Sequence, residues 1–250
     1  MIYYFSATGN SKHVANVLSK ELNEECVSVV DVLNTEISIK DNEKLIIVYP
    51  NYCGGVPSVI REFLQNNKFS LASAAKLILI ITYGNNTGAS DSIATKYFKK
   101  NTGRTFDAMF SVKMPDNWTP VFDLTNAEEV AEINRKADEE IDMITQMIKN
   151  GIVGDHVKDK LGKKMEFIYP GFYKSLSKTI HLHVEDTCIG CGLCEKNCPV
   201  NVITMKDGKP VWTKKNCAMC LGCLHRCPKF AIQYDDKTKN HGQYQHPDNK

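Results

Sequence analysis

The chain has 250 residues, of which 42% are hydrophobic, so it is long enough to bury a sizeable core and to form two domains. Its 31 basic and 29 acidic side chains give a formal net charge of +2, which argues against nucleic acid as a partner. No apolar run is long enough to cross a bilayer and the first residues do not resemble a signal peptide, so we expect a cytoplasmic protein without a membrane span.

Residues 1–150 alternate short apolar runs with amphipathic segments, a pattern typical of an α/β domain with a parallel sheet. Five runs are expected as strands, at residues 2–5, 26–32, 45–49, 76–82 and 105–114. Helices are expected after these strands, at residues 11–24, 57–66, 90–100 and 127–149. Thr125 and Glu128 fit a capping box before the last helix, and Gly151 fits its end.

The turn between the first strand and the first helix combines hydroxyl-bearing residues with a glycine. Backbone N–H groups, hydroxyls and the positive end of the helix dipole point at one place there, which predicts an anion-binding loop. The segment lacks both the glycine–lysine pattern of a nucleoside triphosphatase loop and the three glycines of a dinucleotide-binding turn. Simple capping of the helix is the alternative. The candidate residues are Ser6, Ala7, Thr8, Gly9, Asn10 and Ser11.

This loop, placed at the first strand-to-helix turn and followed by four further strands, resembles the flavodoxins over roughly residues 1–150. The resemblance implies a doubly wound sheet of five parallel strands in the order 2-1-3-4-5. It also implies that the loop binds the phosphate of FMN and that the flavin lies at the switch point between the first and third strands.

Two further loops fall where the flavodoxins hold the flavin ring. In the first, Tyr52 supplies a stacking face, and Gly54 and Gly55 allow a peptide to flip. In the second, Tyr83 and backbone amides reach the ring. Ordinary turn chemistry is the alternative for both loops. The candidate cofactor-binding residues are Pro50, Asn51, Tyr52, Cys53, Gly54, Gly55, Thr82, Tyr83, Gly84 and Asn85.

Four other residues in this part of the chain are considered one by one. Trp118 lies in a segment, residues 115–120, for which we find no flavodoxin counterpart. It either covers the flavin, as a further cofactor-binding residue, or packs against the C-terminal domain. Cys53 lacks a histidine or second cysteine nearby, so we expect it to fill space rather than to react. We expect Cys26 in the core and His13 on the surface of its helix.

Residues 151–180 contain several glycines and a proline that interrupt any long element. We therefore expect a linker that packs on one or both domains. Residues 236–250 are polar and show no periodicity, so a solvated tail is expected at the end of the chain. Metal binding by His241 and His246 is the alternative for the tail.

The strongest pattern in the chain is a duplicated cysteine motif, in which each copy reads C-x2-C-x2-C-x3-C-P. Thiolates at this spacing wrap a tight loop around one face of an iron–sulfur cluster, and Gly190, Gly192 and Gly222 let the backbone approach the sulfides. A disulfide framework is disfavoured because nothing else suggests secretion. Zinc is disfavoured because its sites pair two short ligand clusters. The candidate ligands are Cys188, Cys191, Cys194, Cys198, Cys217, Cys220, Cys223 and Cys227.

The segment from about residue 186 to residue 234 resembles the bacterial two-cluster ferredoxins along its whole length. The resemblance implies a small α+β domain, assigned to residues 181–235, that holds two [4Fe–4S] clusters. In such a run the fourth cysteine binds the other cluster. The implied ligand sets are Cys188, Cys191, Cys194 and Cys227 for one cluster, and Cys217, Cys220, Cys223 and Cys198 for the other.

Together, the two resemblances predict an iron–sulfur flavoprotein that passes electrons between two [4Fe–4S] clusters and FMN, and so links one-electron carriers to one- or two-electron flavin chemistry. The expected partners are redox proteins, either ferredoxin- or flavodoxin-type carriers or an oxidoreductase. A flavin-dependent reductase of a quinone or nitro compound and a redox sensor are the alternatives, so the sequence leaves open whether the protein is an enzyme. The electron donor and acceptor, the direction of electron flow and the oligomeric state do not follow from the sequence.

Overall fold

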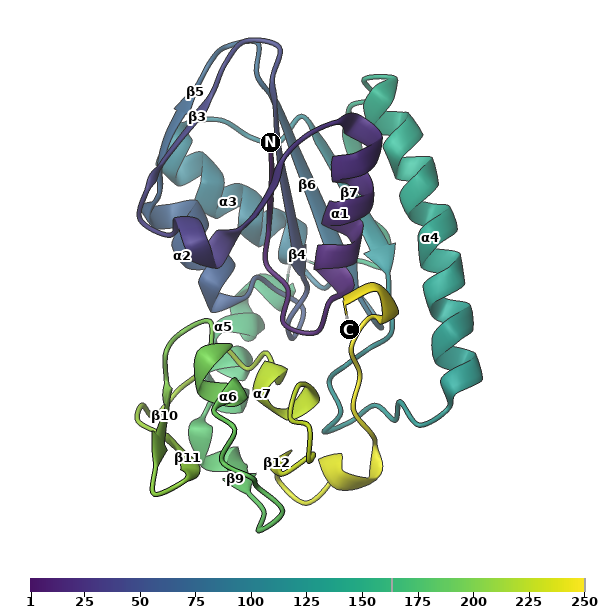
Figure 1. Ribbon diagram of the computed structural model, residues 1–250. Helices are drawn as coiled ribbons and strands as arrows, with labels where there is room; N and C mark the ends of the chain where they lie inside the picture. Colours follow the sequence, from purple (N-terminus) through teal and green to yellow (C-terminus); the bar gives the residue numbers. More distant parts are fainter. Residues whose placement is uncertain (163, 250) are drawn as a thin grey trace.

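The computed structural model describes residues 1–162 and 164–249 (Figure 1). Within these residues, the central sheet has six parallel strands in the order β2-β1-β4-β6-β7-β8. They are β1 (Ile2–Tyr4), β2 (Cys26–Ser28), β4 (Lys44–Pro50), β6 (Lys76–Tyr83), β7 (Ala108–Lys113) and β8 (Gly154–His156). A second parallel pair is formed by β3 (Glu36–Ile39) and β5 (Lys68–Leu71).

Helices cover both faces of this sheet (Figure 1). One face packs against α1 (Asn10–Leu22) and α4 (Ala127–Lys149), and the other against α2 (Ser58–Asn66) and α3 (Ser90–Thr102). The two middle strands, β4 and β6, are therefore buried along almost their whole length. Burial on both faces explains why these two strands are continuous apolar runs in the sequence rather than alternating patterns.

The predicted α/β fold class, with a largely parallel sheet and a smaller C-terminal unit, is confirmed. Two details differ from the expectation. The second strand stops at Ser28, because the chain turns into the 3₁₀ helix η1 (Val29–Val32). The sheet also gains β8, which comes from the segment expected to be a linker and pairs with β7. The sheet thus has one strand more than the five predicted.

Helix α4 begins one residue later than the predicted capping box implies. The Asn126 side chain caps it by accepting a hydrogen bond from Glu129 N at 3.2 Å. The Thr125 hydroxyl instead donates to Asp123 Oδ1 at 2.7 Å. Although α4 is long, its outer face is charged, and none of the helices formed by the described residues combines the length and apolarity needed to span a membrane.

The cysteine-rich region, defined here as residues 182–234, lies below the sheet in Figure 1. Its two antiparallel pairs join β9 to β12 and β10 to β11, and each pair accompanies one short helix. The elements are β9 (Leu182–Val184), α6 (Leu193–Lys196), β10 (Ile203–Lys206), β11 (Lys209–Trp212), α7 (Gly222–His225) and β12 (Ile232–Tyr234). The internal sequence repeat is therefore matched by a repeat in structure.

The C-terminal segment is not the solvated tail that its polar sequence suggested. Tyr244 is 5% exposed and His246 is 3% exposed, because both pack on the N-terminal end of α1. This packing also buries His13, which we expected on the helix surface and which is 6% exposed. The expectation that Cys26 is a core residue is also wrong, since it is only partly buried on β2 at the edge of the sheet.

Helix α5 (Lys164–Leu176) connects the sheet to the cysteine-rich region. Its Tyr173 side chain is 7% exposed and lies in the core beneath α2. The Tyr173 hydroxyl accepts a hydrogen bond from Ser58 N at 3.1 Å and donates one to Ala218 O at 2.9 Å. A single buried hydroxyl therefore bonds the first turn of α2 to the loop before Cys220.

We predict that Tyr173→Phe destabilises the protein by about 1–3 kcal/mol, because it leaves Ala218 O and Ser58 N without their partner in a buried site. The matched control is Tyr97→Phe, since Tyr97 is partly buried and its hydroxyl makes no hydrogen bond among the described residues. The melting temperature of the holoprotein, measured without oxygen, should fall by roughly 2–10 °C in Tyr173→Phe alone. Equal shifts in both variants would contradict the assignment.

Candidate functional site

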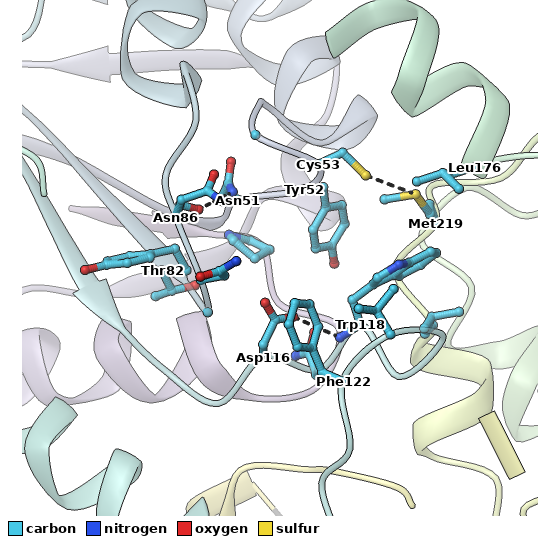
Figure 2. A pocket seen from close by; sticks show the side chains of 18 of the residues that line it. Asn51, Tyr52, Cys53, Thr82, Asn86, Asp116, Trp118, Phe122, Leu176 and Met219 are labelled. Atoms are coloured by element: carbon cyan, nitrogen blue, oxygen red, sulfur yellow. Dashed lines mark hydrogen bonds between the residues drawn. The ribbon is translucent and has the colours of Figure 1, made fainter. Parts of the chain in front are cut away.

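A cavity of about 360 Å³ opens at the carboxyl ends of β4, β6 and β7, where the cysteine-rich region meets the sheet. Three loops from the sheet line it, at residues 50–54, 82–86 and 115–118. The opposite wall includes Met219, Cys220 and Leu221. Figure 2 shows Tyr52, Trp118 and Met219 directed toward the same space. The cavity therefore has walls from both parts of the chain.

The loop of residues 6–11 is held in shape by its own hydroxyls. Ser6 Oγ accepts a hydrogen bond from Gly9 N at 3.1 Å, and Thr8 Oγ1 accepts one from Asn117 Nδ2 at 2.6 Å. Ser11 Oγ lies 2.8 Å from Thr82 Oγ1. Gly9 precedes α1 with φ 107°, a backbone angle that glycine adopts without strain. Within the described residues, no side chain caps the first turn of α1, so its N–H groups are available to an anion.

The structure divides the predicted cofactor-binding residues between two neighbouring spaces. The large cavity is lined by Asn10, Pro50, Asn51, Tyr52, Cys53, Gly54, Thr82, Tyr83, Gly84, Asn85 and Trp118. Ser6 and Ala7 instead line a smaller cavity of about 200 Å³, which they share with Cys198 and Cys220. Thr8, Gly9, Ser11 and Gly55 line neither cavity, although Thr8 and Ser11 are buried beside them.

The loop after β4 turns tightly beneath α5. A Cβ atom on Gly55 would lie 2.5 Å from the Tyr169 ring, so only glycine fits there. Cys53 takes a positive φ of 53° and places Sγ 3.7 Å from Met219 Sδ, across the boundary with the cysteine-rich region. Burial raises the pKa of the Cys53 thiol to about 12. The thiol is therefore neutral at physiological pH, which agrees with a packing role and not with a reactive thiolate.

Residues 115–118 link the cavity to the cysteine-rich region. Asp116 Oδ1 accepts a hydrogen bond from Trp118 N at 3.1 Å, and burial raises the pKa of this carboxyl. Asn117 O lies 2.9 Å from His225 Nε2 on α7. Trp118 lines the cavity and also packs edge-on against Tyr234, with ring centroids 5.1 Å apart. Trp118 therefore packs against the cysteine-rich region, while its predicted role as a cover of the flavin stays a prediction.

Sequence reasoning missed Asp116, Asn117, Phe122 and Met219 as lining residues. Asp116 and Asn117 stand directly beside Trp118, so the same inserted segment contained the signal for them. Met219 stands between two cysteine ligand candidates, and nothing in the sequence places it against Cys53. The contact follows from tertiary packing alone.

The cavity fits a planar cofactor that carries hydrogen-bond donors. Asn51 Nδ2 donates to Asn86 O at 2.8 Å, whereas Asn51 Oδ1 is buried and has no partner among the described residues. Buried polar atoms are almost always paired, so this acceptor points to a missing donor. The volume also falls within the usual range of cofactor sites. The strand-end loops, the open acceptor and the uncapped helix together fit FMN.

The eight predicted ligand cysteines form two groups of four, each around its own small cavity. Cys188, Cys191, Cys194 and Cys227 line one, and Cys198, Cys217, Cys220 and Cys223 line the other. We call these the outer group and the inner group, respectively. In each group, three cysteines come from one copy of the motif and the fourth from the other copy. All ten cysteines of the chain lie in the described residues and none is in a disulfide.

The surroundings of these sulfur atoms suit metal-bound thiolates. Burial raises the pKa of Cys217 to about 11 and that of Cys220 to about 12, so a thiolate at either position requires a cation beside it. Backbone N–H groups already point at the sulfurs, with Met219 N 3.2 Å from Cys217 Sγ and Ala231 N 3.3 Å from Cys227 Sγ. Amide donors of this kind stabilise the negative charge of iron–sulfur clusters.

Comparisons with known proteins match both parts of the chain. The flavodoxin domain family matches residues 1–143, and the 4Fe-4S dicluster domain family matches residues 187–232. An uncharacterized protein of Methanocaldococcus jannaschii is 37% identical over 57 residues, which cover 22% of this chain and 21% of that protein. A ferredoxin of Acetoanaerobium sticklandii is 57% identical over 28 residues, covering 11% of this chain and 50% of the ferredoxin. The chain thus spans half or less of these relatives, and no solved structure matches it.

We predict that the fourth cysteine of each motif serves the group formed by the other motif. The wild-type protein, purified without oxygen, should contain about eight iron and eight acid-labile sulfide per chain. Cys198→Ala should damage the inner cluster and Cys191→Ala the outer one, while Cys26→Ala serves as the cysteine control. Electron paramagnetic resonance of the reduced variants separates the two signals. Loss of the same signal in both variants, or zinc in place of iron, would overturn the assignment.

Proposed function

The chain belongs to the flavodoxin family, and we propose that it transfers electrons between two [4Fe–4S] clusters of its C-terminal dicluster domain and FMN bound in the cavity described above. The observation that supports this proposal most directly is the composition of the cavity wall. Tyr52 and Cys53 of the flavodoxin domain line one cavity together with Met219 and Cys220 of the cysteine-rich region. An FMN ring in that cavity would lie against a ligand of the inner cluster.

We assign each part of FMN to particular residues of the site. The amides and hydroxyls of residues 6–11 would hold the phosphate, Tyr52 and Trp118 would flank the ring, and Asn51 Oδ1 would accept a hydrogen bond from it. When bound, FMN supplies one- or two-electron chemistry, whereas each cluster exchanges one electron. The protein supplies binding, orientation and exclusion of water.

The positions of the two cysteine groups suggest an order of electron transfer. Cys220 of the inner group lines the FMN cavity, whereas no cysteine of the outer group does. The outer group instead lies beside surface side chains, with Ile189 60% exposed and Leu193 40% exposed. We therefore place the outer cluster at the contact with a redox partner protein and the inner cluster between it and FMN.

Exposed apolar side chains in the cavity lining favour a second candidate function, the reduction of a small molecule. Val121 is 63% exposed and Phe172 is 50% exposed, and both line the cavity. An apolar quinone or nitro compound would find a suitable surface there. Turnover of such a compound by the reduced protein, at a rate that depends on its concentration, would favour this function over electron transfer to a partner.

The order of transfer is tested by rapid mixing of the holoprotein with a reduced ferredoxin-type carrier in the absence of oxygen. Cluster and flavin absorbance are followed separately. We expect the clusters to be reduced first and the flavin afterwards, and we expect the flavin to be reduced far more slowly in Cys191→Ala. Cys26→Ala should behave as wild type. Flavin reduction that is equally fast without the outer cluster would contradict the proposed route.

A second prediction concerns the phosphate of FMN. Because the loop is proposed to bind it, apoprotein should bind FMN much more tightly than riboflavin. Thr8→Ala removes one hydrogen bond to a charged oxygen, a loss of roughly 1.5–3 kcal/mol or about ten- to a hundredfold in affinity. Thr8→Ser keeps the hydroxyl and should bind nearly as wild type. Equal affinity of the wild type for FMN and riboflavin would mean that the loop is only a helix cap.

A further inference from the structure

The C-terminal segment runs from the cysteine-rich region to the N-terminal end of α1, as the yellow trace in Figure 1 shows. We call residues 241–248 the strap. At its start, Gln243 Nε2 donates hydrogen bonds to Leu224 O at 2.6 Å and to Cys227 O at 2.8 Å. Tyr244 N then donates to His225 Nδ1 at 3.1 Å. These bonds attach the strap to α7 and to the loop that follows it.

The middle of the strap contacts the loop that is proposed to bind phosphate. His246 N donates a hydrogen bond to Thr8 O at 2.8 Å. The Tyr244 hydroxyl donates to Asn10 Oδ1 at 2.7 Å and also lies 3.1 Å from Asn134 Oδ1 on α4. Thr8 and Asn10 belong to the loop of residues 6–11, and Asn10 lines the large cavity. The strap thus bonds to the backbone of one loop residue and to the side chain of another.

The end of the strap is fixed to α1 through His13. This imidazole lies between two carboxylates, with Nε2 2.6 Å from Asp138 Oδ1 and Nδ1 2.8 Å from Asp248 Oδ2. The His246 ring stacks on it, with centroids 3.9 Å apart and an interplanar angle of 23°. His13 and His246 are both buried, at 6% and 3% exposure. The end of the strap is therefore held by the contact of Asp248 with His13 and by a ring stack, one turn into α1.

We propose that the strap is a positioning element of the FMN site, which holds the phosphate-binding loop in its binding conformation and thereby slows the release of FMN. This inference rests on the proposed function, since it concerns the same site. None of the strap residues was predicted to take part in cofactor binding, and none lines the large cavity. Their effect is transmitted through Thr8, Asn10 and His13.

The same side chains raise the question of a metal site. One donor atom from each of His13, His246 and Asp248 lies within 4.8 Å of the others. The lone pairs of an imidazole lie in the plane of its ring, however, and two rings stacked nearly in parallel do not direct them at one point. Both ring nitrogens of His13 also already face carboxylates. The geometry fits an attachment of the strap to α1 better than a metal centre. We call this attachment, formed by His13, His246 and Asp248, the latch.

The latch is sensitive to acid in a direction that follows from its burial. The groups that face His246 are His13 on α1, Asp138 on α4 and Asp248 on the strap itself. Burial, followed by the nearby His13, lowers the pKa of His246 from 6.5 to about 4. The attached strap therefore holds a neutral His246. The contribution of neutral His246 to strap attachment is complete above about pH 6.5. It is lost as pH falls from there toward 4, because in that range His246 takes up a proton only when the strap is detached.

The proposal is tested by the rate at which FMN leaves the holoprotein, read from the fluorescence of released flavin. Tyr244→Phe removes the bond to Asn10, and Asp248→Asn removes the carboxylate that faces His13 Nδ1. Each should accelerate release by about two- to tenfold, the effect expected for the loss of one hydrogen bond. Asp236→Asn is the control, since Asp236 is exposed and makes no contact of this kind among the described residues. Iron content should be the same in all of these proteins.

The pH dependence of FMN release distinguishes loss of the latch from a general weakening of the fold. If release requires strap detachment, lowering the pH from about 7.5 to about 6 should accelerate it by about fourfold through His246. The FMN phosphate also titrates in this range, so the informative quantity is the difference between wild type and His246→Phe. His246→Phe keeps a stacked ring that takes up no proton, and it should lose the fourfold component.

Three results would overturn the proposal, and each is distinct from failure of the proposed function. The first is wild-type release rates in Tyr244→Phe and Asp248→Asn. The second is an identical pH profile in wild type and His246→Phe. The third is slower release of FMN when Zn²⁺ is added, reversed by a chelator. That result would mean that His13, His246 and Asp248 form a metal site. If the wild type retains no FMN at all, the proposed function fails first.

Discussion

Parallel pairing of β1, β4, β6 and β7 determines where everything else in this molecule has to lie. It sends the loops that follow these strands to one edge of the sheet, so Asn10, Tyr52, Tyr83 and Asp116 line one cavity although they are far apart in the sequence. The reversal of strand order between β1 and β4 leaves a crevice at that edge. The cysteine-rich region covers this crevice rather than an arbitrary face, so a cysteine of the inner group becomes part of its wall.

The boundary between the two parts of the chain is a packed interface. Tyr169 and Tyr173 on α5 belong to the same buried cluster as Phe63 under the sheet and Met219 beside the inner cysteines. Directed bonds supplement this packing, through the Tyr173 hydroxyl, the contact of His225 with Asn117, and the strap. A buried core with bonds at several points restricts relative motion much more than a flexible linker does. A fixed geometry suits electron transfer, whose rate falls steeply with distance.

The parts of the fold that were predictable from the sequence are those in which local pattern and global structure agree. The buried runs that became β4 and β6, and the spacing of the cysteines, require no knowledge of distant residues. The features that were not predicted depend instead on residues far away in the sequence. Strand β8 has only three residues, all exposed, and exists because β7 offers it an edge. Tyr244 and His246 lie in a polar stretch, and they are buried because they contact residues of α1 and α4.

The same distinction applies to the candidate site. Most of the candidates that follow β4 and β6 line the large cavity, because a motif at the end of a strand carries its own position, given the order of the strands. Met219 and the strap could not be placed in this way, since their role depends on how two separately recognisable units are joined. Such joining contacts use residues with no motif, here a methionine between ligands, a tyrosine hydroxyl and two histidines. In a chain that fuses two familiar domains, the contacts that motifs do not predict therefore lie at the junction between the domains. A single-domain relative has no equivalent residues there from which these contacts could be inferred.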